Sequence, residues 1–210
     1  MSFIVYNYVY LLSIGRSTVA QSSKREQLIQ ASLELFSLTG YSAVGVNTIA
    51  EKAGVTKKTL YHHFKSKEEL ILAVLRYYDE RHRNSFMRSV EERAKNPEDR
   101  LLVIFDILEE WFNSKNFSGC LFVRAMGEYP EEGTSIRSVC QESKVLTQRY
   151  IQSLAEKAEL QDADELSEQF MLLIEGAITM AQVNNSYLSA VRAKKVAKVL
   201  IKGSTPMQLQ

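Results

Sequence analysis

The most informative segment of the chain is Thr56-Lys57-Lys58-Thr59-Leu60-Tyr61-His62-His63-Phe64. Its first residue, Thr56, has a hydroxyl that suits the N-cap of a helix. Leu60 and Phe64 are four residues apart, so a helix would place them on one face and bury them together. The two lysines then occupy the first turn. This pattern suits a helix that enters a DNA major groove N-terminus first, whereas the simpler interpretation is a solvated basic surface helix.

The residues on both sides of this stretch favour the DNA-binding interpretation. Residues 49–55 predict a short helix that ends at Gly54, a residue suited to the positive φ of a tight turn. A helix, a short turn and a second, basic helix make up a helix-turn-helix motif. Downstream, Ser66 and Glu69 have the S-x-x-E spacing of a capping box, which predicts that another helix begins there.

Positive charge is concentrated in the same region. The formal net charge of the chain is only +1, but residues 52–67 contain no Asp or Glu. The lysines of this segment are Lys52, Lys57, Lys58, Lys65 and Lys67. A local basic patch on a nearly neutral chain indicates a docking surface for a polyanion.

The segment from Lys24 to about Leu75 resembles the TetR/AcrR family of bacterial transcriptional regulators. The matching residues are Ala31, Leu35, Phe36, Gly40, Tyr41, Ile49, Ala50, Gly54, Val55, Thr56, Thr59, Leu60, Tyr61, His63, Phe64, Ser66, Lys67, Glu68 and Leu70. The resemblance implies a homodimer that binds a palindromic double-stranded DNA operator and a small-molecule effector. Combined with the helix geometry, it gives a DNA-facing set of Asn47, Thr56, Lys57, Lys58, Thr59, Tyr61, His62, His63 and Lys67. Within this set we assign Lys58 to bases, and Tyr61 and Lys67 to phosphates.

Composition and periodicity predict an all-α fold. Glycine (9) and proline (3) are scarce among the 210 residues, and long stretches show helical periodicity. We expect a loose or mis-called extension at residues 1–21, a helix-turn-helix domain at 22–75 with the start of a long linking helix, a helical effector-binding and dimerisation domain at 76–203, and a tail at 204–210. Further helices are expected near residues 98–112, 120–126, 134–160, 165–184 and 187–202, with the short one ended by Gly127 and Pro130.

The N-terminal segment does not look like a targeting signal. Its apolar run is too short to span a membrane, and no Lys or Arg precedes it as in a signal peptide. We therefore expect a cytoplasmic protein without a membrane partner.

Motifs for catalysis and cofactor binding are absent from the sequence. It has no phosphate-binding glycine loop, no H-E-x-x-H motif, no nucleophile elbow and no cysteine pair at metal spacing. His62 and His63 are adjacent, so a helix points them in different directions and they cannot share a metal ion. We therefore expect no enzyme activity, no cofactor and no metal site.

The helices expected at 165–184 and 187–202 have more apolar surface than one core can use, which predicts a four-helix dimer interface. The residues assigned to it are Phe170, Ile174, Ile178, Leu188, Val191, Val196 and Val199. Large side chains spread over several helices predict a pocket for an apolar or aromatic effector. The residues assigned to the pocket are Phe105, Leu108, Trp111, Phe112, Cys120, Phe122, Tyr150 and Phe170.

The sequence thus predicts a DNA-binding transcriptional regulator, a repressor that its effector releases from the operator. Two alternatives remain. One is a DNA-binding protein with a role outside transcription. The other is a thiol-based sensor of oxidants or electrophiles with the same fold, in which Cys120 opens a short helix one turn before Arg124. Most free cysteines in proteins act as small buried hydrophobic residues, which argues against the sensor interpretation.

Overall fold

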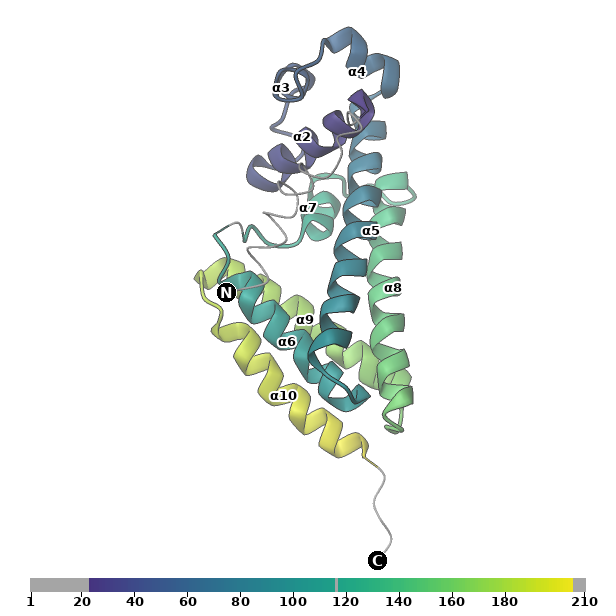
Figure 1. Cartoon of the computed structure of the whole chain (residues 1–210), viewed down its shortest axis with the longest axis vertical. Helices are drawn as coiled ribbons and strands as arrows, with labels where there is room; N and C mark the ends of the chain where they lie inside the picture. The colour runs from purple at the N-terminus through teal and green to yellow at the C-terminus, as the bar shows by residue number, and fades with distance from the viewer. Residues whose placement is uncertain (1–22, 116, 206–210) are drawn as a thin grey trace, which may run out of the picture. The chain divides into compact units, whose positions relative to one another are not determined.

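A computed structural model describes residues 23–115 and 117–205, and within these ranges the chain forms nine helices and no strand (Figure 1). The all-α prediction is therefore confirmed. The helices are α2 (Lys24–Thr39), α3 (Val46–Lys52), α4 (Lys57–His63), α5 (Lys67–Arg93), α6 (Pro97–Phe112), α7 (Leu121–Glu128), α8 (Ser135–Lys157), α9 (Ala163–Asn184) and α10 (Leu188–Ser204). The expected extension at 1–21 and residues 206–210 of the expected tail lie outside the described residues.

The chain forms two compact units, which we describe separately. The head unit contains the described residues up to Arg81 together with Cys120–Ser143, and the body unit contains His82–Gly119 and the residues from Lys144 onward. The head unit thus includes α7 and the start of α8. These segments are far in sequence from the helix-turn-helix and fall in the range that we expected to form the effector-binding domain.

The local signals around α4 act as the sequence predicts. The Thr56 hydroxyl accepts a hydrogen bond from the Thr59 amide at 3.1 Å and caps the helix. Gly54 has a φ of +64°. Residues other than glycine adopt this backbone angle at a cost of about 1–2 kcal/mol. Leu60 and Phe64 are almost fully buried, in one core with Phe36 of α2. This burial holds the short helix α4 by its inner face.

The capping box at the start of α5 is also present. The Ser66 hydroxyl accepts from the Glu69 amide at 3.1 Å, and the Glu69 carboxylate accepts from the Lys65 amide at 2.7 Å. The first bond satisfies an amide of the first turn of α5, and the second reaches the amide of the residue before Ser66 rather than that of Ser66 itself. Together they fix the point where α5 follows α4.

In the body unit, α10 packs against both α6 and α9. Alanines on its inner face, Ala190, Ala193 and Ala197, are buried and let the helices approach closely. From α6 and α9, Phe105 and Phe170 meet with ring centroids 5.7 Å apart, and both are almost fully buried. Asn96 caps α6 by accepting from the Asp99 amide at 2.7 Å.

The short helix ends before Pro130 as expected, but Gly127 does not stop it, because α7 continues through Gly127 to Glu128. An exposed glycine costs a helix only about 1 kcal/mol, which is too little to stop it where the following turn is hydrogen-bonded. Here the Tyr129 amide donates to the Ala125 carbonyl at 2.9 Å, so the last turn closes beyond the glycine.

Candidate nucleic-acid interface

The N-terminal tip of α4 presents the chemistry that the sequence predicts. Thr56, Lys57 and Lys58 are exposed, and the hydroxyls of Thr56 and Thr59 lie 2.9 Å apart. Thr59 is half-buried, so its hydroxyl supports the cap while the two lysines remain at the surface. A helix tip with positive side chains and outward-facing amides suits a phosphate-lined groove.

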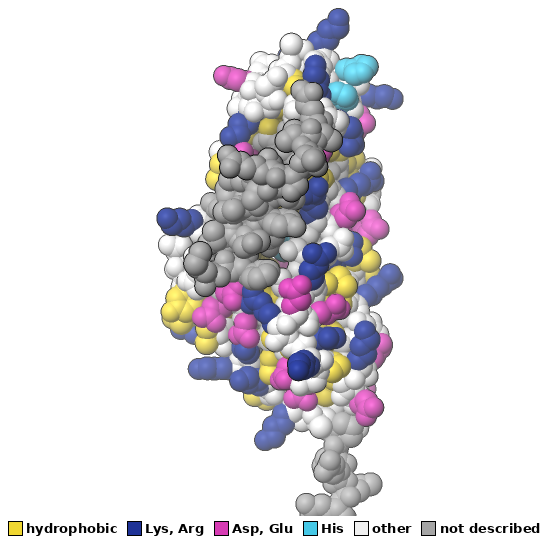
Figure 2. Space-filling view, in the orientation of Figure 1, with side chains coloured by type: hydrophobic (Ala, Val, Ile, Leu, Met, Phe, Trp, Pro, Cys, Tyr) yellow, Lys and Arg dark blue, Asp and Glu magenta, His cyan; other side chains and the backbone are white. Residues whose placement is uncertain are grey.

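The aromatic residues of α4 follow the lysines on its outer side. Tyr61 is 44% exposed, and the Lys57 ammonium lies 6.0 Å from the centre of its ring. His62 is exposed and His63 is half-buried, with their ring centroids 5.3 Å apart. Lys, Arg and His side chains gather over the part of the molecule that holds α4 (Figure 2).

Two of the five lysines in the basic segment are engaged within the protein. Lys52 forms a 2.9 Å ion pair with Glu34. The Lys67 ammonium donates to the Ser42 carbonyl oxygen at 3.3 Å, and burial, partly offset by the nearby Glu128 carboxylate, lowers the pKa of Lys67. The exposed positive surface therefore comes mainly from Lys57, Lys58 and Lys65.

Two residues on neighbouring helices are also relevant to DNA binding. Asn47 is exposed in the first turn of α3, where Gly45 is the N-cap and supplies no side chain. Arg25 near the start of α2 places its guanidinium carbon 5.1 Å from the centre of the Phe64 ring, beside the end of α4. Arg25 was not in the predicted DNA-facing set. The sequence does predict a helix that begins near Ser22, but a basic residue at a helix start is more often simply solvated.

The residues assigned to an effector pocket are divided between the units. Cys120 and Phe122 belong to the head unit, where Phe122 packs against Tyr78 with ring centroids 5.6 Å apart. Phe105, Leu108, Trp111, Phe112, Tyr150 and Phe170 belong to the body unit, where all except the half-buried Trp111 are buried. Trp111 meets Phe117 edge to face at 5.0 Å, so the aromatic residues near the end of α6 contact one another.

Tyr150 on α8 differs from its aromatic neighbours in one respect. Its ring meets Phe86 at 6.4 Å, and its hydroxyl is buried without a hydrogen-bond partner among the described residues. Burial, together with the charge of Glu91, raises the pKa of Tyr150 to about 12. An unpaired buried hydroxyl is uncommon in folded proteins, so Tyr150 is the residue of the predicted pocket with free polar capacity.

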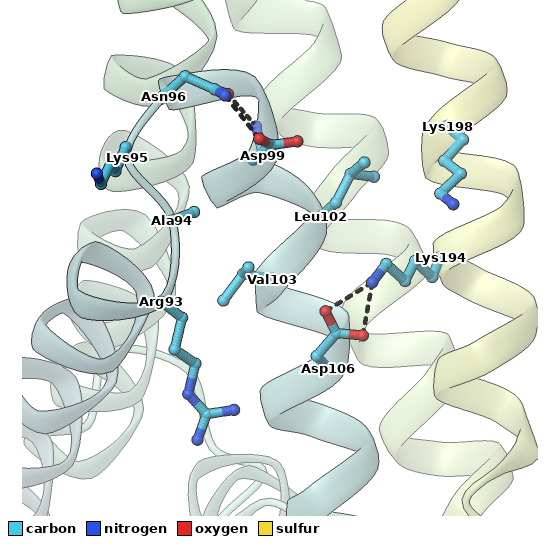
Figure 3. A pocket seen from close by; sticks show the side chains of 10 residues that line it. All are labelled: Arg93, Ala94, Lys95, Asn96, Asp99, Leu102, Val103, Asp106, Lys194 and Lys198. Atoms are coloured by element: carbon cyan, nitrogen blue, oxygen red, sulfur yellow. Dashed lines mark hydrogen bonds and ion pairs between the residues drawn. The ribbon is translucent and has the colours of Figure 1, made fainter.

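The body unit also has an open groove of about 560 Å³ between the N-terminal half of α6 and α10. Figure 3 shows the Lys194 ammonium bridging both carboxylate oxygens of Asp106, at 2.6 Å each, with Lys198 one turn further along α10. None of the residues that we assigned to the effector pocket lines this groove. Its charged lining does not suit an apolar ligand.

The residues assigned to the dimer interface fall into two groups. Phe170, Ile174 and Ile178 are buried within the chain, and Val191 is half-buried. Leu188, Val196 and Val199 are exposed, with Val199 at 70%. The structure adds exposed apolar residues on α9 that we had not assigned, namely Leu172, Met180 and Val183. Helical periodicity placed the apolar residues on faces but could not tell which face the chain covers itself.

Within residues 23–115 and 117–205, no helix is long and apolar enough to cross a membrane, and no three His, Cys, Asp or Glu side chains are grouped so as to hold a metal ion. Cys120 is half-buried and Cys140 is buried, and neither forms a disulfide.

Comparison with known proteins agrees with this geometry. Residues 28–74 match the model of the bacterial regulatory proteins of the tetR family. The HTH-type transcriptional regulator YjdC of Escherichia coli is 23% identical over 179 residues, which cover 85% of this chain and 94% of YjdC. The HTH-type transcriptional activator FasR of Mycolicibacterium smegmatis is 37% identical over 93 residues, covering 44% of this chain and 41% of FasR.

The fold extends the likeness beyond the head. A TetR-family transcriptional regulator from Streptomyces coelicolor superposes with a TM-score of 0.80 at 21% identity, covering 89% of this chain and 98% of that one. The helix-turn-helix geometry and the match over residues 28–74 identify a tetR-family DNA-binding region in the head, and the chain as a whole shares the fold of a TetR-family transcriptional regulator.

Proposed function

We propose that this regulator is a repressor that binds a palindromic operator as a homodimer and leaves it when a small effector binds. The observation that carries the proposal is the exposed tip of α4, Lys57 and Lys58 behind the Thr56 cap, on a helix whose inner face is buried. A rigidly held basic helix tip is the part of a helix-turn-helix that reads bases in the major groove.

Within this proposal the side chains of the head have different roles. Lys58 reads base edges, because it projects from the first turn of α4. Thr56, Lys57, Tyr61 and His62 contact the operator around it, and the half-buried His63 and Thr59 lie at the edge of this surface. Lys65 is better placed than Lys67 to contact a phosphate, since Lys67 already donates to the Ser42 carbonyl. Asn47 of α3 contacts the sugar-phosphate backbone of the DNA.

The proposed dimer surface consists of the exposed apolar residues of α9 and α10, namely Leu172, Met180, Val183, Leu188, Val196 and Val199. Burying such residues against a second copy stabilises by about 1.5–3 kcal/mol for each side chain that becomes fully covered. A two-fold axis through this surface would build a four-helix interface and bring two heads to one palindrome. The buried Phe170, Ile174 and Ile178 support this surface from inside the chain.

The proposed effector is apolar or aromatic and carries one hydrogen-bond acceptor. The body unit places Phe86, Phe105 and Tyr150 among its buried or half-buried aromatic residues, and the Tyr150 hydroxyl has no partner among the described residues. A carbonyl or ether oxygen of the ligand would accept a hydrogen bond from this hydroxyl. The apolar part of the ligand would pack against the surrounding side chains. No observation favours the alternative roles, a thiol-based sensor or a DNA-binding protein outside transcription.

The test starts with selection of duplexes from a random library by the wild-type protein. The selected sequence, placed over a promoter in a reporter strain, should lower expression, and effector candidates found by thermal shift should restore it. The single tryptophan, Trp111, reports on the body unit through its fluorescence. A selected site that raises expression would assign activation instead, the function in the name of FasR.

A further inference from the structure

Two side chains of α7 bind the backbone of the helix-turn-helix region from more than 80 residues away. The Arg124 guanidinium donates from Nη1 to the carbonyl oxygens of Phe36 at 3.1 Å and Ser37 at 2.9 Å. These carbonyls belong to the last turn of α2, where a helix has acceptors without intrahelical donors and a partial negative charge. Arg124 thus holds the C-terminus of α2 at a defined point.

Glu128, one turn further along α7, binds the turn that follows α2. Its two carboxylate oxygens accept from the backbone amides of Tyr41 at 3.0 Å and Ser42 at 2.6 Å. Burial alone would raise the pKa of Glu128, but the hydrogen bonds from Ser42 and Tyr41 and the charge of Arg124 outweigh it and lower the pKa. The carboxylate therefore stays ionised and acts as a paired acceptor.

The fit at this turn is close. Gly40 has a φ of +88°, and a Cβ atom there would lie 2.7 Å from Glu128 Oε1, so a larger residue would displace the carboxylate from its present position. Beyond it, the buried Tyr41 donates from its hydroxyl to the Leu121 carbonyl at 3.1 Å, and Lys67 of α5 donates to the Ser42 carbonyl. The turn is therefore held by contacts from α5 and α7 in addition to its own glycine.

The position of this turn determines where the DNA-reading helices lie. It leads after three residues into α3, and α3 packs against α4. Hydrophobic contacts from Leu121, Phe122 and Ala125 already join α7 to the head core. Those contacts are non-directional, whereas hydrogen bonds to named backbone atoms fix a register.

We propose that Arg124 and Glu128 are positioning residues for DNA recognition, although they lie outside the 28–74 family match. They form a polar clamp, Arg124 on the α2 carbonyls and Glu128 on the amides of the following turn, that orients α3 and α4 for base contacts. The inference rests on the proposed sequence-specific binding and adds residues that do not touch DNA.

The test uses the full chain and a duplex selected from a random library by the wild-type protein, with a scrambled duplex for comparison. The variants are Glu128→Gln, which replaces one acceptor oxygen by an amide donor, Arg124→Met, which removes the donors, and Arg124→Lys, which keeps the charge. Glu132→Gln is the matched control, because Glu132 is an exposed carboxylate after the end of α7 and makes the same charge change. All affinities are measured well below each variant's melting temperature.

We expect Glu128→Gln and Arg124→Met to weaken binding to the selected duplex by at least about fivefold, the scale of losing charge-assisted hydrogen bonds. The affinity of both variants for the scrambled duplex, and the slope of log affinity against log salt, should stay within about twofold of the wild-type values. The reason is that the phosphate-facing lysines are unchanged. The affinity of Arg124→Lys for the selected duplex should lie between those of the wild type and Arg124→Met. Glu132→Gln should match the wild type.

Two results would overturn the clamp. One is an unchanged affinity of both variants for the selected duplex. The other is an equal loss on both duplexes together with a lower melting temperature, which would show that these residues only stabilise the fold. If Arg124→Met does not fold, Arg124→Lys and Glu128→Gln still decide the matter. Failure of the wild-type protein to enrich any sequence would instead contradict the proposed function itself.

Discussion

The Lys67 ammonium donates to the Ser42 carbonyl oxygen at 3.3 Å, which joins the start of α5 to the turn before α3. This contact gives Lys67 a structural role at a position where the sequence predicted a phosphate contact. Lys65, two residues earlier, is exposed and belongs to the same basic segment. The two lysines therefore form a natural pair for separating stability from DNA contact.

Lys67→Ala should lower the melting temperature more than Lys65→Ala, because only Lys67 loses an internal hydrogen bond. Lys65→Ala should lower the slope of log affinity against log salt by roughly 0.9 per head, the value for one phosphate contact. Thermal unfolding and salt titrations on one duplex check both effects. A larger change in the salt slope for Lys67→Ala than for Lys65→Ala would show that Lys67 is the phosphate contact instead.

Lys58→Ala should relax sequence preference at one or two base pairs and cost about 1–3 kcal/mol on the best site. Tyr61→Phe should weaken binding to all sequences alike, because we assign its hydroxyl to a phosphate. Competition binding against single-base variants of the selected duplex measures the difference. Lys195→Ala on α10 is the control, since it removes an exposed lysine of the body unit. Equal loss of preference in Lys58→Ala and Tyr61→Phe would refute this division of roles.

Val199→Glu combined with Val196→Glu should convert the dimer to a folded monomer, because both side chains are exposed on α10 and leave the core intact. Ile178→Glu should instead unfold the body unit, because its side chain is buried in the chain's own core. Light scattering and circular dichroism separate the two outcomes. Leu38→Glu, at an apolar residue of α2 that is 67% exposed, should stay dimeric. A dimer that persists in the double valine variant would exclude this surface.

The lowered pKa of Glu128 predicts a pH dependence of stability. A carboxylate with a folded-state pKa below its ordinary value of 4.5 stabilises the protein above pH 4.5 and loses this effect as the pH falls through the folded-state pKa. The stability difference between the wild-type protein and Glu128→Gln should therefore be constant near neutrality and shrink below pH 4.5. Urea unfolding at a series of pH values measures it. A difference that does not change with pH would mean that the carboxylate's charge is not what stabilises the turn.

The sequence predicted the local features of the head well. The Thr56 cap, the Gly54 turn and the Ser66–Glu69 capping box depend on residues within a few positions of one another, so their spacing is visible in the sequence. The burial of Leu60 and Phe64 followed from their spacing of four. Helix type and order were therefore predictable along the described chain.

Long-range contacts were not predictable from the sequence. Nothing in the spacing of Arg124 or Glu128 indicates that they bind the backbone near residue 40, because that contact depends on how α7 packs. The same limit explains Ile178 and Val199, which are both apolar residues at helical spacing, although one is buried and the other exposed. Periodicity finds an apolar face, but only the tertiary packing shows what covers it.

The central claim is that α4 reads DNA sequence, and the most direct measurement is the ratio of wild-type affinities for the selected and scrambled duplexes at physiological salt. We expect a ratio of at least about 10³, the lower range for specific DNA-binding proteins. Lys57→Ala combined with Lys58→Ala should lower the ratio by at least about fivefold while the protein stays folded, because a base contact contributes about 1–3 kcal/mol of discrimination. Equal affinity of the wild-type protein for both duplexes, or a ratio that the double variant leaves unchanged, would contradict the claim.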